Sequence, residues 1–112
     1  MAFEKVAALD ELREGEALPV TVGGLPVALA RGDDDQVYAV HDLCTHAEVA
    51  LSEGDVSDCR IECWGHGSWF DLRSGKPVGP PATDPVATFP VEVRDGQIYV
   101  DITTTLNGVS AR

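Results

Sequence analysis

The 112-residue sequence is poor in basic side chains and contains no long apolar run. It has 8 lysines and arginines and 19 aspartates and glutamates, so its formal net charge is −11. This balance argues against nucleic acid as a partner, because contact with phosphates requires clustered lysines and arginines. No apolar stretch approaches the roughly 18 residues that a membrane-spanning helix needs. The acidic N-terminal segment MAFEKVAALDELREG also lacks the basic start and apolar core of a signal peptide. The sequence therefore predicts a soluble, cytoplasmic protein without a membrane anchor.

Signatures of catalysis are absent as well. The chain contains no Ser-His-Asp set, phosphate-binding loop or nucleotide-binding fingerprint. Its 112 residues suffice for one domain with a single core, but not for a core together with a substrate-binding module. We therefore expect a protein that is not itself an enzyme.

Cysteine and histidine are scarce, yet four of these six residues form two short pairs. The runs C-T-H at 44–46 and C-W-G-H at 63–66 are separated by 16 residues. In a Rieske [2Fe–2S] cluster two cysteines hold one iron and two histidines hold the other, so each of two loops must supply one Cys and one His. A structural zinc site is an alternative, although zinc motifs usually pair like residues on each loop, and coincidence is a third. The candidate ligands are Cys44, His46, Cys63 and His66.

The residues that follow the second pair resemble the Rieske family. The run HGSWFD at 66–71 is similar to the HGSxFD run of Rieske proteins, and GPPA at 79–82 is similar to the proline loop that covers their cluster. The resemblance implies one [2Fe–2S] cluster per chain, with Cys44 and Cys63 on one iron and His46 and His66 on the other. It also implies an all-β fold in residues 1–102: a Rieske-type antiparallel β-sandwich or barrel, with an inserted cluster-binding subdomain at about 41–82.

The hydrophobic pattern independently indicates a β-rich chain with regular turns. Strands are predicted for seven short alternating or apolar runs: 20–22, 27–30, 37–40, 59–63, 69–72, 91–94 and 97–100. Gly23-Gly24 and Asp95-Gly96 predict two-residue hairpin turns between neighbouring strands. One short helix is expected at 10–13, with Asp10 as its cap. The segment 103–112 has no hydrophobic pattern, and we expect it to be disordered.

The resemblance also implies a function. A single-domain chain with one cluster is similar to the ferredoxin component of a ring-hydroxylating oxygenase system. Such a carrier passes one electron at a time from a ferredoxin reductase to a terminal oxygenase. We expect a monomer that contacts both partners transiently. Two alternatives remain open: the small Rieske subunit of an assimilatory nitrite reductase, and an iron–sulfur redox sensor or assembly accessory.

Two departures from high-potential Rieske proteins predict a low reduction potential. Those proteins have a disulfide between the ligand loops, whereas the matching residues here are Val49 and Gly65. They also place a tyrosine hydroxyl near a cysteine sulfur, whereas the matching residue here is Phe70. A lost hydrogen bond to sulfur removes stabilisation of the reduced, more negative cluster. Ser68 keeps a hydroxyl that is able to donate to a bridging sulfide.

The remaining candidates have mainly structural interpretations. Cys59 is predicted to be a buried, inert thiol, His41 a surface or strand-end histidine, and Asp71 an acceptor of hydrogen bonds within its loop. Of Trp64 and Trp69, one is expected in the core and the other at a partner contact. Four acidic residues between the ligand pairs form either a solvated surface or a patch that steers basic partners: Glu48, Glu53, Asp55 and Asp58.

Overall fold

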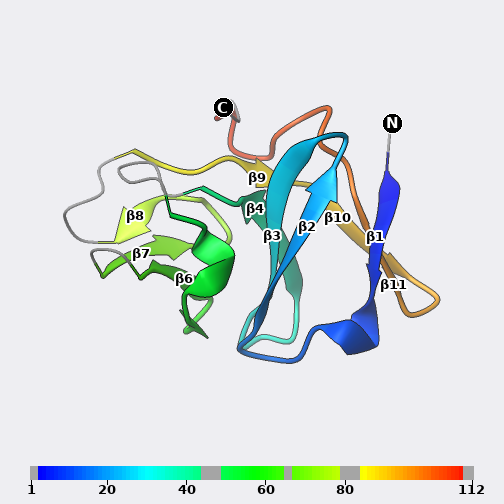
Figure 1. Ribbon diagram of the computed structural model, residues 1–112, viewed down its shortest axis with the longest axis horizontal. Helices are drawn as coiled ribbons and strands as arrows, with labels where there is room; N and C mark the ends of the chain where they lie inside the picture. The colour runs from blue at the N-terminus through cyan, green and yellow to red at the C-terminus, as the bar shows by residue number, and fades with distance from the viewer. Residues whose placement is uncertain (1–2, 44–48, 65–66, 79–83, 110–112) are drawn as a thin grey trace.

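The computed structural model describes residues 3–43, 49–64, 67–78 and 84–109. Within these ranges the chain forms eleven strands and two short 3₁₀ helices (Figure 1). This part of the chain contains no helix that is long and apolar enough to cross a membrane. The prediction of an all-β Rieske-type fold is confirmed.

The strands pair into three antiparallel sheets. Seven of the strands agree with the predicted runs to within a few residues, and the other four are not among those runs. The elements are β1 (Glu4–Ala8), η1 (Leu9–Glu11), β2 (Ala17–Val22), β3 (Leu25–Arg31), β4 (Val37–His41), η2 (Leu51–Glu53), β5 (Val56–Ser57), β6 (Arg60–Cys63), β7 (Ser68–Asp71), β8 (Pro77–Val78), β9 (Thr88–Phe89), β10 (Val91–Arg94) and β11 (Gln97–Val100).

Two of the sheets make a basal part and the third makes a subdomain beside it. The basal sheets have the strand orders β2-β3-β4-β9 and β1-β11-β10, and the subdomain sheet has the order β5-β6-β7-β8. In Figure 1 the subdomain sheet lies to the left of the basal strands. It is inserted in the chain between β4 and β9, so both connections to it leave from neighbouring strands of one basal sheet.

Turn chemistry fixes the two predicted hairpins. Val22 pairs with Leu25 across Gly23-Gly24 in the β2–β3 hairpin. In the β10–β11 hairpin Asp95 has φ 50° and Gly96 has φ 74°, which are the positive values that both central residues of a type I′ turn need. The predicted turns at both positions are therefore confirmed.

Strand β3 is buried on both faces because it contributes to two hydrophobic cores. Val27 and Leu29 pack in the core between the basal sheets. Ala28 and Ala30 face the other way and pack against the subdomain. All four side chains are fully buried, which explains the uninterrupted apolar sequence VALA in place of an alternating one. The subdomain is thus packed directly on the basal sheet.

The predicted helix near residue 10 is a single 3₁₀ turn, Leu9–Glu11, and Asp10 is not its cap. The capping contact comes from the other end of the turn, where the Glu11 carboxylate accepts a hydrogen bond from the Ala8 N–H at 2.8 Å. Three residues are too few for the apolar periodicity that identifies an α-helix.

The C-terminal segment differs from the prediction of a disordered tail over residues 103–109. The Asn107 side chain donates to the carbonyl oxygens of Ser74 and Val86 at 2.9 and 2.7 Å. Its Oδ1 accepts the Thr88 N–H at 3.2 Å, and Val109 packs against the basal core. Polar side-chain contacts hold this segment, and such contacts leave no hydrophobic pattern in the sequence. Residues 110–112 lie outside the described residues.

Candidate metal centre

Of the four predicted ligands, the structure describes Cys63, whereas Cys44, His46 and His66 lie outside the described residues. Cys63 ends strand β6, and its register partner on β7 is Ser68. Both side chains are fully buried. The Cys63 carbonyl accepts the Gly67 N–H at 2.9 Å, with Gly67 at φ 75°, so a tight turn holds this end of the β6–β7 hairpin.

The surroundings of Cys63 suit an iron–sulfur ligand. It is a free thiol, and it packs with Leu51, Ile61 and Phe70 in the subdomain core. Thiolates are soft ligands that favour iron–sulfur clusters and zinc over hard cations. The described ranges, which include only Cys63 of the four predicted ligands, contain no group of three or more His, Cys, Asp or Glu side chains able to hold a metal. The donor set C-T-H and C-W-G-H and the buried thiol therefore fit a [2Fe–2S] cluster.

Asp42 anchors the chain just before the first ligand run. Its carboxylate is buried and accepts hydrogen bonds from the Ser52 N–H at 2.7 Å and the Ser52 hydroxyl at 2.6 Å. Its own N–H donates to the Pro26 carbonyl at 3.0 Å. These bonds link the chain before the first ligand run, at Asp42, to the chain after it, at Ser52. They also link Asp42 to the β2–β3 hairpin. Sequence reasoning missed Asp42, and the only available signal was an acidic residue at the end of an apolar strand.

His41 is a strand-end residue, as predicted, but it is not on the surface. It is the last residue of β4, is only 6% exposed, and is therefore buried. Its Nε2 has no hydrogen-bond partner. Burial lowers the pKa of His41 below the ordinary value, and the negative charge of Asp42 opposes that shift. The surface expectation fails because the basal core extends to the end of β4.

Cys59 is buried, as predicted, but its environment is polar on one side. Arg73 Nη2 donates to the Cys59 Sγ at 3.4 Å. Asp58 and Cys59 form the turn between β5 and β6 with φ values of 54° and 55°, a left-handed conformation that is unusual for residues other than glycine. Cys59 thus contributes to the turn at the opposite end of β6 from Cys63.

A loop of the basal part contacts this turn directly. Asp34 accepts hydrogen bonds from the Tyr38 hydroxyl at 2.5 Å and from Arg73 Nη2 at 3.0 Å. The Tyr38 hydrogen bond is the largest cause that lowers the pKa of Asp34 to about 2. Asp33 accepts the Asp58 N–H at 3.1 Å. These contacts hold the β3–β4 loop of the basal part against the subdomain at the end remote from Cys63.

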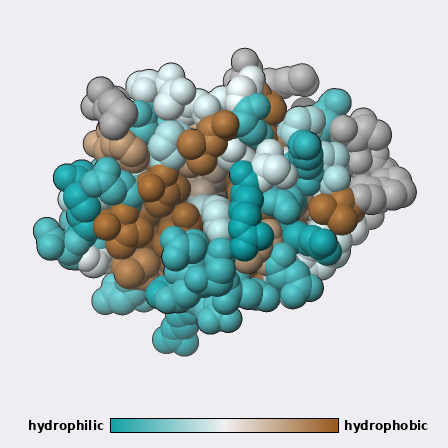
Figure 2. Space-filling view, turned by 180° about the vertical axis from the view of Figure 1, so that it is seen from behind, coloured by the Kyte–Doolittle hydropathy of each residue, from teal (hydrophilic) through white to brown (hydrophobic). Residues whose placement is uncertain are grey.

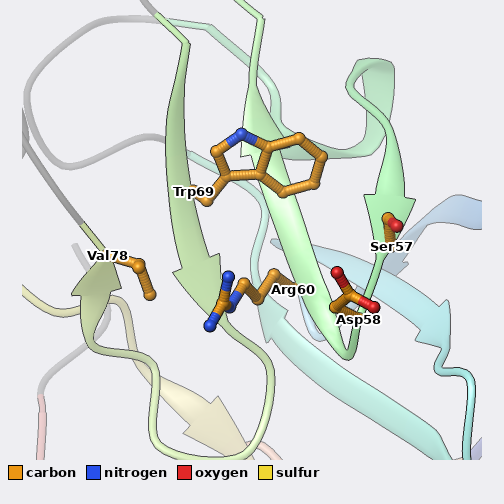
Figure 3. A pocket seen from close by; sticks show the side chains of 5 residues that line it. All are labelled: Ser57, Asp58, Arg60, Trp69 and Val78. Carbon is orange, nitrogen blue, oxygen red and sulfur yellow. The ribbon is translucent and has the colours of Figure 1, made fainter.

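Neither tryptophan lies in the core, so the prediction of one core tryptophan is wrong. Trp64, next to Cys63, is 54% exposed. Trp69 on β7 is half-buried and lines a surface hollow of about 140 Å³ with Ser57, Asp58, Arg60 and Val78 (Figure 3). The alternating pattern of β7 turns Ser68 and Phe70 into the core and therefore turns Trp69 outward.

The predicted role of Asp71 is confirmed, because its Oδ1 accepts the N–H groups of Arg73 at 2.7 Å and Ser74 at 3.1 Å. Among the acidic residues between the ligand pairs, Glu53, Asp55 and Asp58 are exposed. Glu48 lies outside the described residues.

Comparison with known proteins identifies relatives across most of the chain. The model of the Rieske [2Fe–2S] domain matches residues 2–90. The anthranilate 1,2-dioxygenase ferredoxin subunit of Burkholderia cepacia is 39% identical over 100 residues, which cover 89% of this chain and 92% of the relative. Ferredoxin CarAc of Metapseudomonas resinovorans is 41% identical over 97 residues, which cover 86% of this chain and 90% of that relative. A chain in the solved complex of reduced oxygenase and oxidized ferredoxin of carbazole 1,9a-dioxygenase superposes with a TM-score of 0.81 at 41% identity, covering 88% of this chain and 100% of that chain.

The chain therefore belongs to the Rieske [2Fe–2S] family. Its cofactor is a Rieske [2Fe–2S] cluster, so the predicted cofactor is confirmed and the zinc interpretation is not supported. Within the family it is a ferredoxin subunit of a Rieske dioxygenase system, an electron carrier that transfers electrons to an oxygenase.

Proposed function

We propose that Cys44 and Cys63 hold one iron of the cluster and that His46 and His66 hold the other. The observation that best supports this set is the fully buried free thiol of Cys63 at the end of β6, within the region that matches the family. When bound, the cluster supplies one-electron chemistry at a potential that neutral imidazole ligands raise above that of all-cysteine clusters.

The protein contributes position and exclusion of water. The β6–β7 hairpin fixes Cys63, and the bonds between Asp42 and Ser52 fix the chain on both sides of the first ligand run. Fully buried Leu51 and Phe70 keep water away from the Cys63 side. A fixed ligand in dry surroundings at Cys63 limits the rearrangement that accompanies gain or loss of an electron.

We further propose the specific partners and cellular setting. A ferredoxin reductase supplies the electron, and the terminal oxygenase of the same system receives it, both in transient complexes with a monomeric, cytoplasmic ferredoxin. Residues 1–102 form one Rieske domain, with the cluster-binding subdomain at about 41–82. The acidic surface, with Glu53, Asp55 and Asp58 exposed and a net charge of −11, supports weak contacts steered by charge.

Metal analysis and spectroscopy test the ligand set. The purified protein is expected to be brown, to contain two irons per chain as the cluster requires, and to give a rhombic EPR signal after reduction. Exchange of His46 or His66 for Cys should retain part of the cluster at a lower potential, because an anionic ligand replaces a neutral one. Cys59→Ala is the matched control and should leave iron content and spectrum unchanged. Colourless protein with one zinc would contradict the proposal.

Stopped-flow kinetics test the direction of electron flow. The ferredoxin, once reduced by a ferredoxin reductase, should be reoxidised by the terminal oxygenase of the same system within the turnover time of that system. A reduced protein that the oxygenase does not reoxidise would favour the sensor or the nitrite reductase subunit over a carrier for oxygenation.

A further inference from the structure

The outer face of the subdomain sheet carries Trp69, and the exposed Trp64 follows directly after its strand β6. Strand alternation turns Ile61 and Cys63 of β6 into the core, where both are fully buried, and turns Arg60 and Glu62 outward. Across the sheet, Trp69 pairs with Glu62 on one side and with Val78 on the other. One row of this face is therefore Glu62, Trp69 and Val78.

Trp64 extends this row toward the ligand-bearing turn. It lies in the turn directly after Cys63, the last residue of β6, and is 54% exposed, while Val78 is 39% exposed. Both tryptophans of the chain are thus at the surface of the subdomain. In Figure 3 the Trp69 ring lies above the hollow that Arg60, Asp58 and Val78 border. We name as the tryptophan face the outward residues of this sheet together with the exposed Trp64 that follows β6: Ser57, Arg60, Glu62, Trp64, Trp69 and Val78.

The composition of the face is that of a binding surface. Trp and Arg are the side chains most enriched among residues that dominate binding energy, especially where a ring of polar contacts excludes water. Contiguous exposed apolar patches commonly mark an interaction site, whereas single exposed apolar residues do not. The charges on and beside the face are mainly acidic, with Asp55, Asp58, Glu62 and Asp71 against Arg60 and Lys76.

These features define the chemistry of the occupant: an apolar protein surface bordered by basic side chains. In the solved carbazole 1,9a-dioxygenase complex that this chain resembles, a ferredoxin is bound to its oxygenase, which favours the terminal oxygenase as the occupant. The face begins at the residue after Cys63 and continues along β7 to β8, so a partner seated on it lies against the flank of the ligand-bearing hairpin. Resting on the function proposed above, we propose that the terminal oxygenase docks on the tryptophan face, contacting the ligand-bearing end of the subdomain and one flank of it.

Other apolar groups on the surface provide matched controls. Hydrophobic residues also gather over the basal part on the back of the molecule (Figure 2). Val93 on β10 and Leu106 in the C-terminal segment are 43% and 66% exposed. Neither belongs to the subdomain sheet, so truncation of these two residues removes exposed apolar area without altering the tryptophan face.

The test measures the second-order rate of electron transfer from the reduced ferredoxin to its oxygenase, with the ferredoxin below saturation. Trp64→Ala, Trp69→Phe and Val78→Ser are compared with Val93→Ser and Leu106→Ala at one ionic strength. We expect Trp64→Ala and Val78→Ser each to slow the reaction about tenfold or more and Trp69→Phe to slow it less. The two controls should stay within twofold of the wild type. An unchanged visible spectrum and midpoint potential show that each variant retains its fold and cluster.

Three results would overturn the assignment. The rate with the oxygenase could be unchanged in all three face variants, these variants could slow electron transfer from the reductase but not to the oxygenase, or only Trp64→Ala could slow the reaction with the oxygenase. The last result would restrict docking to the ligand-bearing end. Failure of the proposed function would look different, because the wild type itself would then lack the cluster or would not reduce the oxygenase.

Discussion

At the scale of single residues, Phe70 is the side chain with the clearest bearing on the reduction potential. It is fully buried in the same core as Cys63 and has no hydroxyl. We therefore expect a midpoint at the lower end of the Rieske range, roughly −150 to 0 mV. Phe70→Tyr should raise the midpoint if the new hydroxyl donates to a ligand sulfur, because such a bond stabilises the reduced cluster.

A redox titration followed by EPR measures both quantities. Phe89→Tyr is the control, since Phe89 is buried in the core between the basal sheets and should leave the midpoint unchanged. A wild-type midpoint above about +200 mV, well inside the upper part of the Rieske range, would show that another donor or charge dominates.

His41 predicts a loss of stability in mild acid. Burial lowers its pKa in the folded protein below the ordinary 6.5, so the unfolded chain binds the proton more readily. Stability from the neutral imidazole is therefore complete above about pH 6.5 and declines as the pH falls below that value. Thermal unfolding of the holoprotein from pH 7.5 to 5 should show a midpoint that falls more steeply for the wild type than for His41→Gln. Parallel curves would mean that His41 stays neutral in both states or finds a partner when protonated.

The side chains that sequence reasoning placed correctly were those whose chemistry is local. Asp71, for example, binds N–H groups two and three residues away. The ligand pairs are predicted from their spacing and stay a prediction, because three of the four residues lie outside the described ranges. His41 and Asp42 were missed or misplaced because their burial depends on strands that pair from distant parts of the chain. No local pattern records that a basal core reaches the end of β4.

At the scale of elements, Asn107 is the contact that secures the C-terminal segment. Its amide bonds Ser74, Val86 and Thr88, and so joins the turn after β7 to the strand that returns to the basal sheet. The fit is close, because a Cβ added to Gly75, at φ 77°, would lie 2.2 Å from the Val86 carbonyl oxygen and 2.7 Å from Asn107 Nδ2. This packing leaves no room for a side chain at residue 75.

Asn107→Ala should destabilise the protein by about 1–3 kcal/mol, because it leaves carbonyl and N–H groups without their partners. Chemical denaturation followed by circular dichroism measures the change. Thr104→Ala, in the same segment and exposed, should change stability by no more than about 0.5 kcal/mol. Equal stability of the two variants would mean that residues 103–109 contribute little to the folded state.

The elements that sequence reasoning found are the hairpins with strong turns or clear alternation. Most of the strands that sequence reasoning missed are short. Strands β5, β8 and β9 contain two residues each, which is too few for alternation between apolar and polar residues to appear. Strand β1 has the sequence EKVAA, in which apolar and polar residues do not alternate. Such strands exist because their partners hold them, so the sheet determines them more than their own residues do.

At the scale of the whole molecule, the net charge of −11 predicts association that depends on salt. If acidic residues between the ligand pairs steer the partners, the second-order rate should fall steeply as salt rises, because the Debye length shrinks from about 30 Å at 0.01 M to about 10 Å at 0.1 M. Neutralisation of Glu48 and Asp55 together should slow association and leave the midpoint nearly unchanged. Neutralisation of Glu14 and Asp95, outside the subdomain, is the matched control for total charge. If the association rate changes neither with salt nor with neutralisation of either pair of residues, the negative charge serves solubility alone.

Because both faces of β3 are buried, one in each core, the subdomain depends on the basal part for its folded structure. Excision of residues 41–82 would uncover Ala28, Ala30 and Val40, which pack against the subdomain core, and the excised piece would lose the surface on which its own core closes. The cluster-bearing insertion is therefore not a portable module: transplantation into another protein would need β3 and β4 to travel with it. Because one strand serves both cores, the two parts should also unfold in a single cooperative transition, and slow amide exchange should extend across β3 into both of its neighbours.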